Sequence, residues 1–239
     1  MALATTGADD LTALVGLYAI ADLPAPAGLD PLDYAVALLG ARPAGPGPAY
    51  LQLRAKRETH DARRRLLAAL APRCRAAGTL LIVNDDVEAA LAEPGVDGLH
   101  LGQEDLGEGD VAARRAALEA LRERAAGRPR PLLIGLSTHS LAQVDEAAAL
   151  PVDYIGFGPI FATATKENAD PVVGLEGLAG AASRSPRPVV AIGGLDRRSA
   201  LAARQAGAAA VALISALRAP TIAATRSLAA ELSDMLVRT

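Results

Sequence analysis

Cysteine and the large aromatic residues are scarce in this sequence. Among its 239 residues there are one cysteine, two phenylalanines, four tyrosines and no tryptophan. The single cysteine, Cys74, excludes a disulfide within the chain and is typical of a protein in a reducing cytoplasm. It falls within a helical pattern, where we expect it to be buried and unreactive. One cysteine and three scattered histidines also provide no recognisable zinc-binding pattern.

Strong charge of one sign and long apolar runs are also missing. The net charge is −3 and 21% of the residues are charged, which does not indicate a nucleic-acid partner. The N-terminus holds Asp9 and Asp10 and no basic region, so it does not look like a secretory signal. The apolar stretch 205–217 is too short and too dependent on glycine to span a bilayer. We therefore expect a cytoplasmic protein that binds neither nucleic acid nor membrane.

What the sequence does contain is a repeating order of short apolar segments and helical patterns. The apolar segments have the length of strands buried on both faces, and they cover residues 16–20, 50–53, 79–83, 98–101, 132–136, 154–157, 189–192 and 209–214. The helical patterns cover residues 32–41, 60–77, 87–92, 111–126, 141–150, 175–183, 198–206 and 222–237. Strands that alternate with helices predict right-handed βαβ units and a parallel sheet. Eight such units favour a closed barrel over an open sheet, so we predict an α/β fold, a single (β/α)8 TIM barrel.

The predicted barrel forms one domain. No segment has the composition of a linker, and the Pro/Gly-rich residues 41–48 are interpreted as a turn before the second strand. We therefore assign residues 11–239 to a single catalytic barrel domain and expect residues 1–10 to be disordered.

Acidic side chains follow the third and fourth predicted strands. Asn84 and Asp85 end the third, and Asp105 comes shortly after the fourth. Loops that follow the strands form the active face of such barrels, and two adjacent carboxylates repel unless a cation lies between them. Mg²⁺, which takes one or two carboxylates together with phosphate oxygens, suits this pair. The alternative is that each aspartate, or Asp86 in place of Asp85, caps a helix, which we would favour for one aspartate taken alone.

Cations follow the second predicted strand. Gln52 and Arg54 continue the apolar run, and Lys56 comes two residues later, so Arg54 and Lys56 face the same way. An arginine and a lysine in this position suit a phosphate ester, although a solvated helix start is the alternative.

Two further regions offer groups that bind phosphate. The long loop 158–171 contains Thr163, Thr165 and Lys166, and we interpret it as a lid, with a surface loop of no function as the alternative. Gly193-Gly194 and Ile214-Ser215 follow the seventh and eighth predicted strands, where barrels commonly bind phosphate. A tight turn without any ligand would also need glycine there.

The histidines are interpreted mainly as structural residues. His60 falls in a charged helix start and His100 lies inside a strand. His139 stays open, because it follows Ser137 on the expected active face.

Several segments, read in order, resemble the thiamine-phosphate synthases. They are LYAIAD, QLRAK, IVND, GLHLGQEDL, IGLSTHS, DYIGFGPIFATATK, VGLEGL, VVAIGG and ALISAL, and they extend over almost the whole chain. Members of that family are (β/α)8 barrels that join a hydroxymethylpyrimidine diphosphate to a thiazole phosphate, or to its carboxylated precursor, and release pyrophosphate. The resemblance implies a Mg²⁺-dependent transferase with phosphorylated pyrimidine and thiazole substrates. A homo-oligomer is left open.

The resemblance also implies roles for individual residues. Mg²⁺ would be bound by Asp85 and Asp105. The catalytic residues would be Arg54, Lys56, Ser137 and Lys166. The two substrates would be bound by Gln52, Leu53, Arg54, Ala55, Lys56, Asn84, Ser137, Thr163, Ala164, Thr165, Lys166, Gly194, Ile214 and Ser215.

The chain departs from the family pattern in places, and two other functions remain open. Ala55 stands where relatives typically have glutamate, and the stretch 107–130 looks longer than usual. One alternative is a thiazole phosphate tautomerase on the same barrel, for which His139 is the candidate proton-transfer residue. The other is a barrel that binds a thiamine precursor without converting it.

Overall fold

Eight parallel strands form a closed barrel. The computed structural model describes residues 15–40, 47–107, 109–163 and 170–237, so the expected disorder of residues 1–10 lies outside the described part. The strands are β1 (Gly16–Asp22), β2 (Tyr50–Arg54), β3 (Leu80–Asn84), β4 (Gly98–Leu101), β5 (Leu133–Thr138), β6 (Tyr154–Phe157), β7 (Val189–Ala191) and β8 (Ala210–Leu213). Each strand pairs in parallel with the next in sequence, and β8 pairs with β1 to close the barrel. The predicted (β/α)8 TIM barrel is confirmed.

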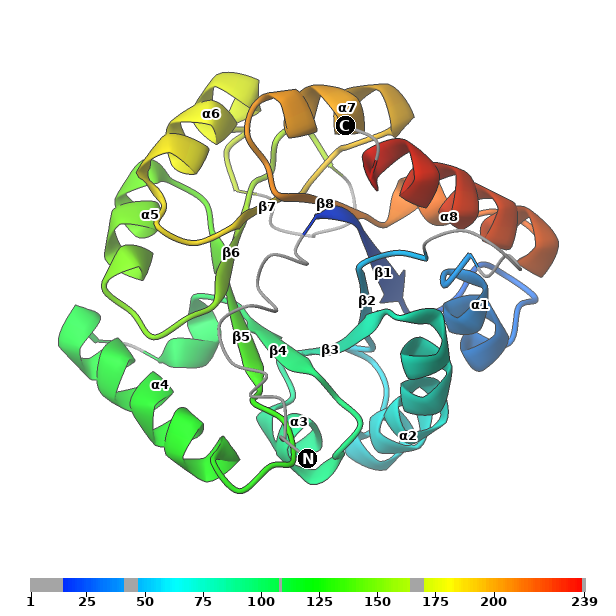
Figure 1. Cartoon of the computed structure of the whole chain (residues 1–239), viewed down its shortest axis with the longest axis horizontal. Helices are drawn as coiled ribbons and strands as arrows, with labels where there is room; N and C mark the ends of the chain where they lie inside the picture. Colours follow the sequence, from blue (N-terminus) through cyan, green and yellow to red (C-terminus); the bar gives the residue numbers. More distant parts are fainter. Residues whose placement is uncertain (1–14, 41–46, 108, 164–169, 238–239) are drawn as a thin grey trace, which may run out of the picture.

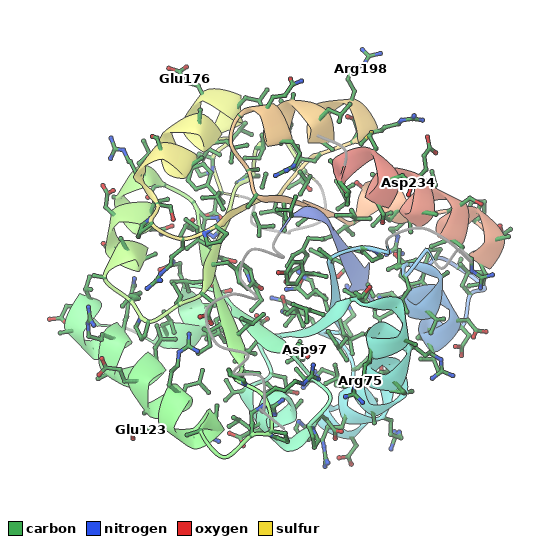
Figure 2. All side chains as sticks on the ribbon, viewed as in Figure 1. Arg75, Asp97, Glu123, Glu176, Arg198 and Asp234 are labelled. Atoms are coloured by element: carbon green, nitrogen blue, oxygen red, sulfur yellow. The ribbon has the colours of Figure 1, made fainter. Side chains whose placement is uncertain are left out.

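Helices surround the barrel as an outer ring (Figure 1). They are α1 (Pro31–Ala37), α2 (His60–Ala77), α3 (Val87–Ala92), α4 (Val111–Ala125), α5 (Leu141–Ala148), α6 (Gly174–Arg184), α7 (Arg197–Gln205) and α8 (Ile222–Val237). Short 3₁₀ turns, η2 (Glu104–Leu106) and η3 (Ser215–Leu217), follow β4 and β8. Figure 2 shows that charged side chains such as Glu123, Glu176 and Arg198 point outward from this ring. Among the described residues, no helix is both long and apolar enough to cross a membrane.

Most helices begin at a side chain that accepts a hydrogen bond from the first turn. These capping residues are Asp30 for α1, Thr59 for α2, Asp86 for α3, Asp110 for α4, Ser140 for α5 and Asp196 for α7. Each satisfies a backbone N–H group that has no partner within its helix. The first helix is shorter than predicted, because it ends at Ala37 instead of continuing to residue 41.

The core has two layers because successive side chains of a strand point to opposite faces. The outward faces pack against the helices, in a large apolar layer that includes Leu17, Leu51 and Cys74. Cys74 is buried, as predicted, and burial raises the pKa of its thiol to about 12. The inward faces fill the barrel with Tyr18, Tyr50 and Tyr154 among smaller aliphatic residues. Three of the four tyrosines of the chain therefore lie inside the barrel, whereas Tyr34 and Phe157 belong to the outer layer.

Candidate active site

Side-chain alternation along the strands brings the polar strand ends into one cavity. Arg54 points the same way as Gln52, and it lies beside Asp22 of β1 in the register of the sheet. In the same way, Asn84 of β3 lies beside His100 of β4. The cavity is about 180 Å³ and opens at the carboxyl ends of the strands. This is the face on which barrels of this type place their active sites.

Most of the described residues predicted to form a site line this cavity. Those that line it are Gln52, Arg54, Lys56, Asn84, Asp85, Ser137, Thr163, Gly194, Ile214 and Ser215. Leu53 and Ala55 instead pack into the layer between strands and helices, so a ligand contact from them would come from the backbone. Ala164, Thr165 and Lys166, together with the tip of the expected lid, lie outside the described residues.

The two cations of the QLRAK segment are each paired with a carboxylate. Arg54 makes an ion pair with Asp22 at the end of β1. Lys56 lies 3.2 Å from Asp85, measured from Nζ to Oδ2. The side chain of Lys56 is about half exposed, at 49%, so its ammonium group remains accessible to a ligand. The arrangement holds both cations beside the cavity without burying them.

Asp85 and Asp105 lie next to each other, as the Mg²⁺ hypothesis requires. The pKa of Asp105 is raised to about 6, first by burial and then by the charge of Asp85 and a hydrogen bond between the two side chains. The backbone N–H of Gly102 donates to Asp105 at 2.7 Å and opposes this effect. Two carboxyl groups that share a proton in this way form an oxygen site in which a divalent cation can replace the proton. No group of three or more His, Cys, Asp or Glu ligands is present among the described residues.

The capping alternative applies to neighbouring aspartates. The carboxylate of Asp86 accepts from the N–H of Ala89 at 3.0 Å and so caps α3. Asp110 caps α4 in the same way. Asp85 and Asp105 are therefore free of this role. Asp85 also has a φ of +62°, a left-handed conformation that is uncommon for any residue except glycine and is often found at functional sites.

Arg63 of α2 links the two loops that present these groups. Its Nε donates to the carboxylate of Asp86 at 2.7 Å, next to the strained turn at Asp85. Its Nη1 donates to the carbonyl oxygens of Ala55 and Glu58, in the loop that follows Arg54 and Lys56. Burial alone would raise the pKa of Asp86, but the hydrogen bonds from the Ala89 N–H, Arg63 and His60 outweigh burial and lower it. Asp86 therefore stays ionised and holds Arg63 in place.

His100 is a cavity residue that the sequence interpretation assigned to structure alone. Its Nε2 lies 3.0 Å from Ser137 Oγ, and its Nδ1 lies 3.1 Å from the hydroxyl of Tyr154. Burial lowers the pKa of His100 to about 4, so the ring is neutral at physiological pH.

At the turn after β7, the wall of the cavity is formed by backbone. Gly194 has a φ of +65°, and a Cβ there would lie 2.5 Å from the carbonyl oxygen of Ala162. Only glycine therefore allows the turn after β7 to approach the loop after β6 so closely. Gly194 lines the cavity together with Ile214 and Ser215 at the end of β8, and phosphate binding there stays a prediction.

The comparisons with known proteins agree with this geometry. A family model described as thiamine monophosphate synthase matches residues 18–217. A thiamine-phosphate synthase of Laribacter hongkongensis is 43% identical over 190 residues, which are 76% of this chain and 80% of that protein. The chain belongs to the thiamine monophosphate synthase family. A family member from Azorhizobium caulinodans is also 43% identical, over 154 residues that make up 64% of each protein.

A solved structure supports the same assignment. The thiamine phosphate pyrophosphorylase of Pyrococcus furiosus superimposes with a TM-score of 0.73 at 28% identity. The superposition covers 95% of this chain and 99% of that one. Membership of the thiamine monophosphate synthase family therefore holds for the fold as well as for the sequence, and the chain is an enzyme of that family.

Proposed function

We propose that this chain condenses 4-amino-2-methyl-5-(diphosphooxymethyl)pyrimidine with 4-methyl-5-(2-phosphooxyethyl)thiazole, or with its carboxylated precursor. The products are thiamine phosphate and pyrophosphate. The observation that supports this most directly is that Lys56 contacts Asp85, which interacts with Asp105 and lines the same cavity as Arg54. Cations and a divalent-metal site side by side suit a diphosphate ester that must depart as an anion.

The first chemical step breaks the carbon–oxygen bond between the pyrimidine methylene group and the diphosphate. The bonding electrons leave with the diphosphate oxygen, and the electron-rich aminopyrimidine stabilises the cation that remains. Arg54 and Lys56 line the cavity where the new negative charge develops. They therefore stabilise the transition state more than the ground state. Ser137 donates a hydrogen bond to the diphosphate in this proposal, and the family resemblance adds Lys166 as a further cation.

Asp85 and Asp105 fit a Mg²⁺ ion by the chemistry of their oxygens. They are adjacent carboxyl groups in mutual contact, a donor set of the kind Mg²⁺ uses together with phosphate oxygens. The bound ion would neutralise charge on the departing diphosphate. Asn84, at the end of β3, lies beside this pair and is available to the pyrimidine diphosphate.

The second step forms the new carbon–nitrogen bond. The ring nitrogen of the thiazole attacks the pyrimidine methylene with its lone pair, and no proton has to be removed. Thr163, Gly194 and Ser215 line the same cavity and are proposed to bind the thiazole phosphate through backbone N–H and hydroxyl groups. They follow β6, β7 and β8, whereas Arg54 ends β2, so the thiazole phosphate would be held by other strands than the diphosphate.

The direct test uses the purified chain, both substrates and Mg²⁺. We expect thiamine phosphate and pyrophosphate to appear in equal amounts, and chelation of the metal to stop the reaction. An Asp85→Asn variant should form much less thiamine phosphate while keeping its fold. The absence of product at saturating Mg²⁺ and substrate would refute the proposal.

Tautomerisation of the thiazole phosphate is the second candidate, and the environment of His139 favours it. The Nδ1–H of His139 donates to the carbonyl of Gly158 at 2.7 Å, and Asp170 lies 3.5 Å from the same nitrogen. Nε2 is then the basic nitrogen, and His139 lines the cavity. A His139→Ala variant separates the two functions. Unchanged conversion of the thiazole phosphate by this variant would exclude His139 as the proton-transfer residue, and no conversion by the unmodified protein would exclude the tautomerase function.

A further inference from the structure

A chain of hydrogen bonds runs through residues that line the cavity. The Nε2 of Gln52 donates to the hydroxyl of Tyr18 at 3.2 Å, and the hydroxyls of Tyr18 and Tyr154 lie 3.0 Å apart. The Tyr154 hydroxyl is 3.1 Å from Nδ1 of His100, whose Nε2 is 3.0 Å from Ser137 Oγ. Gln52, Tyr18 and Tyr154 are at most 3% exposed. The hydrogen-bond chain thus links Gln52 of β2 to Ser137 of β5.

Local sequence makes room for this chain. Tyr154 lies across Gly135 of the neighbouring strand, where a Cβ would come within 2.1 Å of the tyrosine ring. The ring of Tyr154 is stacked against that of His100, with ring centroids 5.5 Å apart. Any larger residue at position 135 would displace Tyr154, so the position of its hydroxyl is set by packing as well as by hydrogen bonds.

The donor at one end favours one direction for the hydrogen bonds. Tyr18 accepts from Gln52, so its single proton is free to be donated to Tyr154, and Tyr154 can then donate to Nδ1 of His100. A neutral imidazole that accepts at Nδ1 holds its proton on Nε2 and donates it to Ser137 Oγ. The proton of the Ser137 hydroxyl is then available to a ligand in the cavity.

We propose that Gln52, Tyr18, Tyr154 and His100 form a directed hydrogen-bond chain that makes Ser137 a donor toward the anionic group of the substrate. His100 and Tyr154 are then positioning residues, since they act on the ligand through Ser137. The reverse direction would make Ser137 donate to His100 and present only lone pairs to the diphosphate, which repels them. The identity of the anion rests on the proposed function, whereas the direction of the chain does not.

The first experiment determines the tautomer of His100 in the ligand-free protein. With ¹⁵N-labelled histidine, long-range proton–nitrogen correlation spectra distinguish protonated Nε2 from protonated Nδ1, and only three histidines have to be assigned. We expect His100 to hold its proton on Nε2. A proton on Nδ1 would overturn the proposal whether or not the protein makes thiamine phosphate. If the protein has the predicted tautomer but no synthase activity, the directed hydrogen-bond chain is supported and the proposed function is rejected.

Variants then test whether the chain sets the tautomer. Tyr154→Phe removes the hydroxyl that donates to Nδ1. Gln52→Leu removes the first donor, and only the histidine spectrum of this variant is interpreted. We expect both to populate the Nδ1–H form, and Tyr154→Phe to lower kcat about tenfold, the value of roughly one hydrogen bond. Unchanged tautomer and unchanged kcat in Tyr154→Phe would contradict the proposal.

Tyr34→Phe is the matched control. Tyr34 is also fully buried, but among the described residues its hydroxyl has no hydrogen-bond partner, and it does not line the cavity. The same substitution there should change neither the His100 tautomer nor kcat. A general effect of losing a buried hydroxyl would appear in both variants and would argue against a directed chain.

Discussion

Basic side chains at the two ends of the barrel have different partners. At the amino end, the terminal nitrogens of Arg128 donate to four backbone carbonyls, those of Ala90, Leu91, Glu93 and Val96. At the carboxyl end, Arg54 and Lys56 line the cavity and are each paired with a carboxylate.

The partner determines what a cation can do. A guanidinium whose donors are bound to backbone carbonyls fixes loops and has little left to offer a ligand. A cation that is paired with one carboxylate beside a cavity keeps other donors for an anion that enters, as the half-exposed Lys56 does beside Asp85. The amino end is therefore built for stability and the carboxyl end for binding. Each prediction below tests one side of this difference.

The largest effect is expected at Arg54. Replacement by methionine keeps the length of the side chain and removes the charge that, in the proposed function, faces the departing diphosphate. We expect kcat/KM to fall by about 10²–10³-fold, as for the loss of one preorganised donor in other enzymes, with little change in melting temperature. Steady-state kinetics and thermal unfolding measure the two. Arg57→Met is the control, since this neighbouring exposed arginine does not line the cavity. An equal loss of activity in both variants would contradict the comparison.

Arg128 should show the opposite pattern. Arg128→Met leaves four carbonyl groups without their donor, so we expect the free energy of unfolding to fall by about 2–4 kcal/mol. The kcat of the protein that remains folded should not change. Denaturant unfolding is the measurement, and Arg124→Met is the control, because Arg124 makes only an exposed ion pair with Glu88. Loss of kcat without loss of stability would show that the amino end takes part in the reaction.

Metal affinity should depend on pH through Asp105. Its pKa is raised to about 6 by burial and by Asp85, so the carboxyl group is ionised above that pH and protonated below it. Because a proton competes with Mg²⁺, the affinity should be full at pH 7 and about tenfold lower at pH 5. Calorimetric titration of Mg²⁺ at several pH values measures this. Asp105→Asn should bind weakly and without this pH step, and the same step in that variant would assign it to another group.

The fold and most of the cavity could be predicted from the sequence. Eight apolar segments of strand length predicted the barrel, and the polar residues that follow them predicted which end would hold Arg54, Lys56 and Asp85. This worked because parallel strands bring their carboxyl ends together, whatever their separation along the chain.

The residues that were missed depend on register and parity. His100 lies in a strand that is buried on both faces, so the alternation of apolar and polar residues that would have placed it inside the barrel is hidden. The partner of Arg54, Asp22, could be named only once the register between β1 and β2 was known. The choice between Asp85 and Asp86 as helix cap depended on one left-handed turn, which a sequence pattern does not specify.

The smallest effect is expected at Arg63. This residue lies at the carboxyl end of the barrel but has backbone partners like those of Arg128. It lies beside the cavity, yet it is bound like the amino-end arginines, to the carbonyls of Ala55 and Glu58 and to the carboxylate of Asp86. Arg63→Met should therefore loosen the turn that holds Asp85. We expect Mg²⁺ to bind about three- to tenfold more weakly, which corresponds to roughly 1 kcal/mol.

Calorimetric titration of Mg²⁺ without substrates is the measurement for Arg63, and two variants sharpen it. Arg63→Lys retains the pairing with Asp86 but loses the fork that reaches the carbonyls, so it should recover only part of the affinity. Arg64→Met is the control, because Arg64 pairs with Glu93 on the outside of the barrel. If Arg63→Met lowers the free energy of unfolding but leaves Mg²⁺ affinity unchanged, the link between the two loops serves stability alone. Position along the barrel axis would then be a poor guide to the role of an arginine, and the pattern of its partners would be the better one.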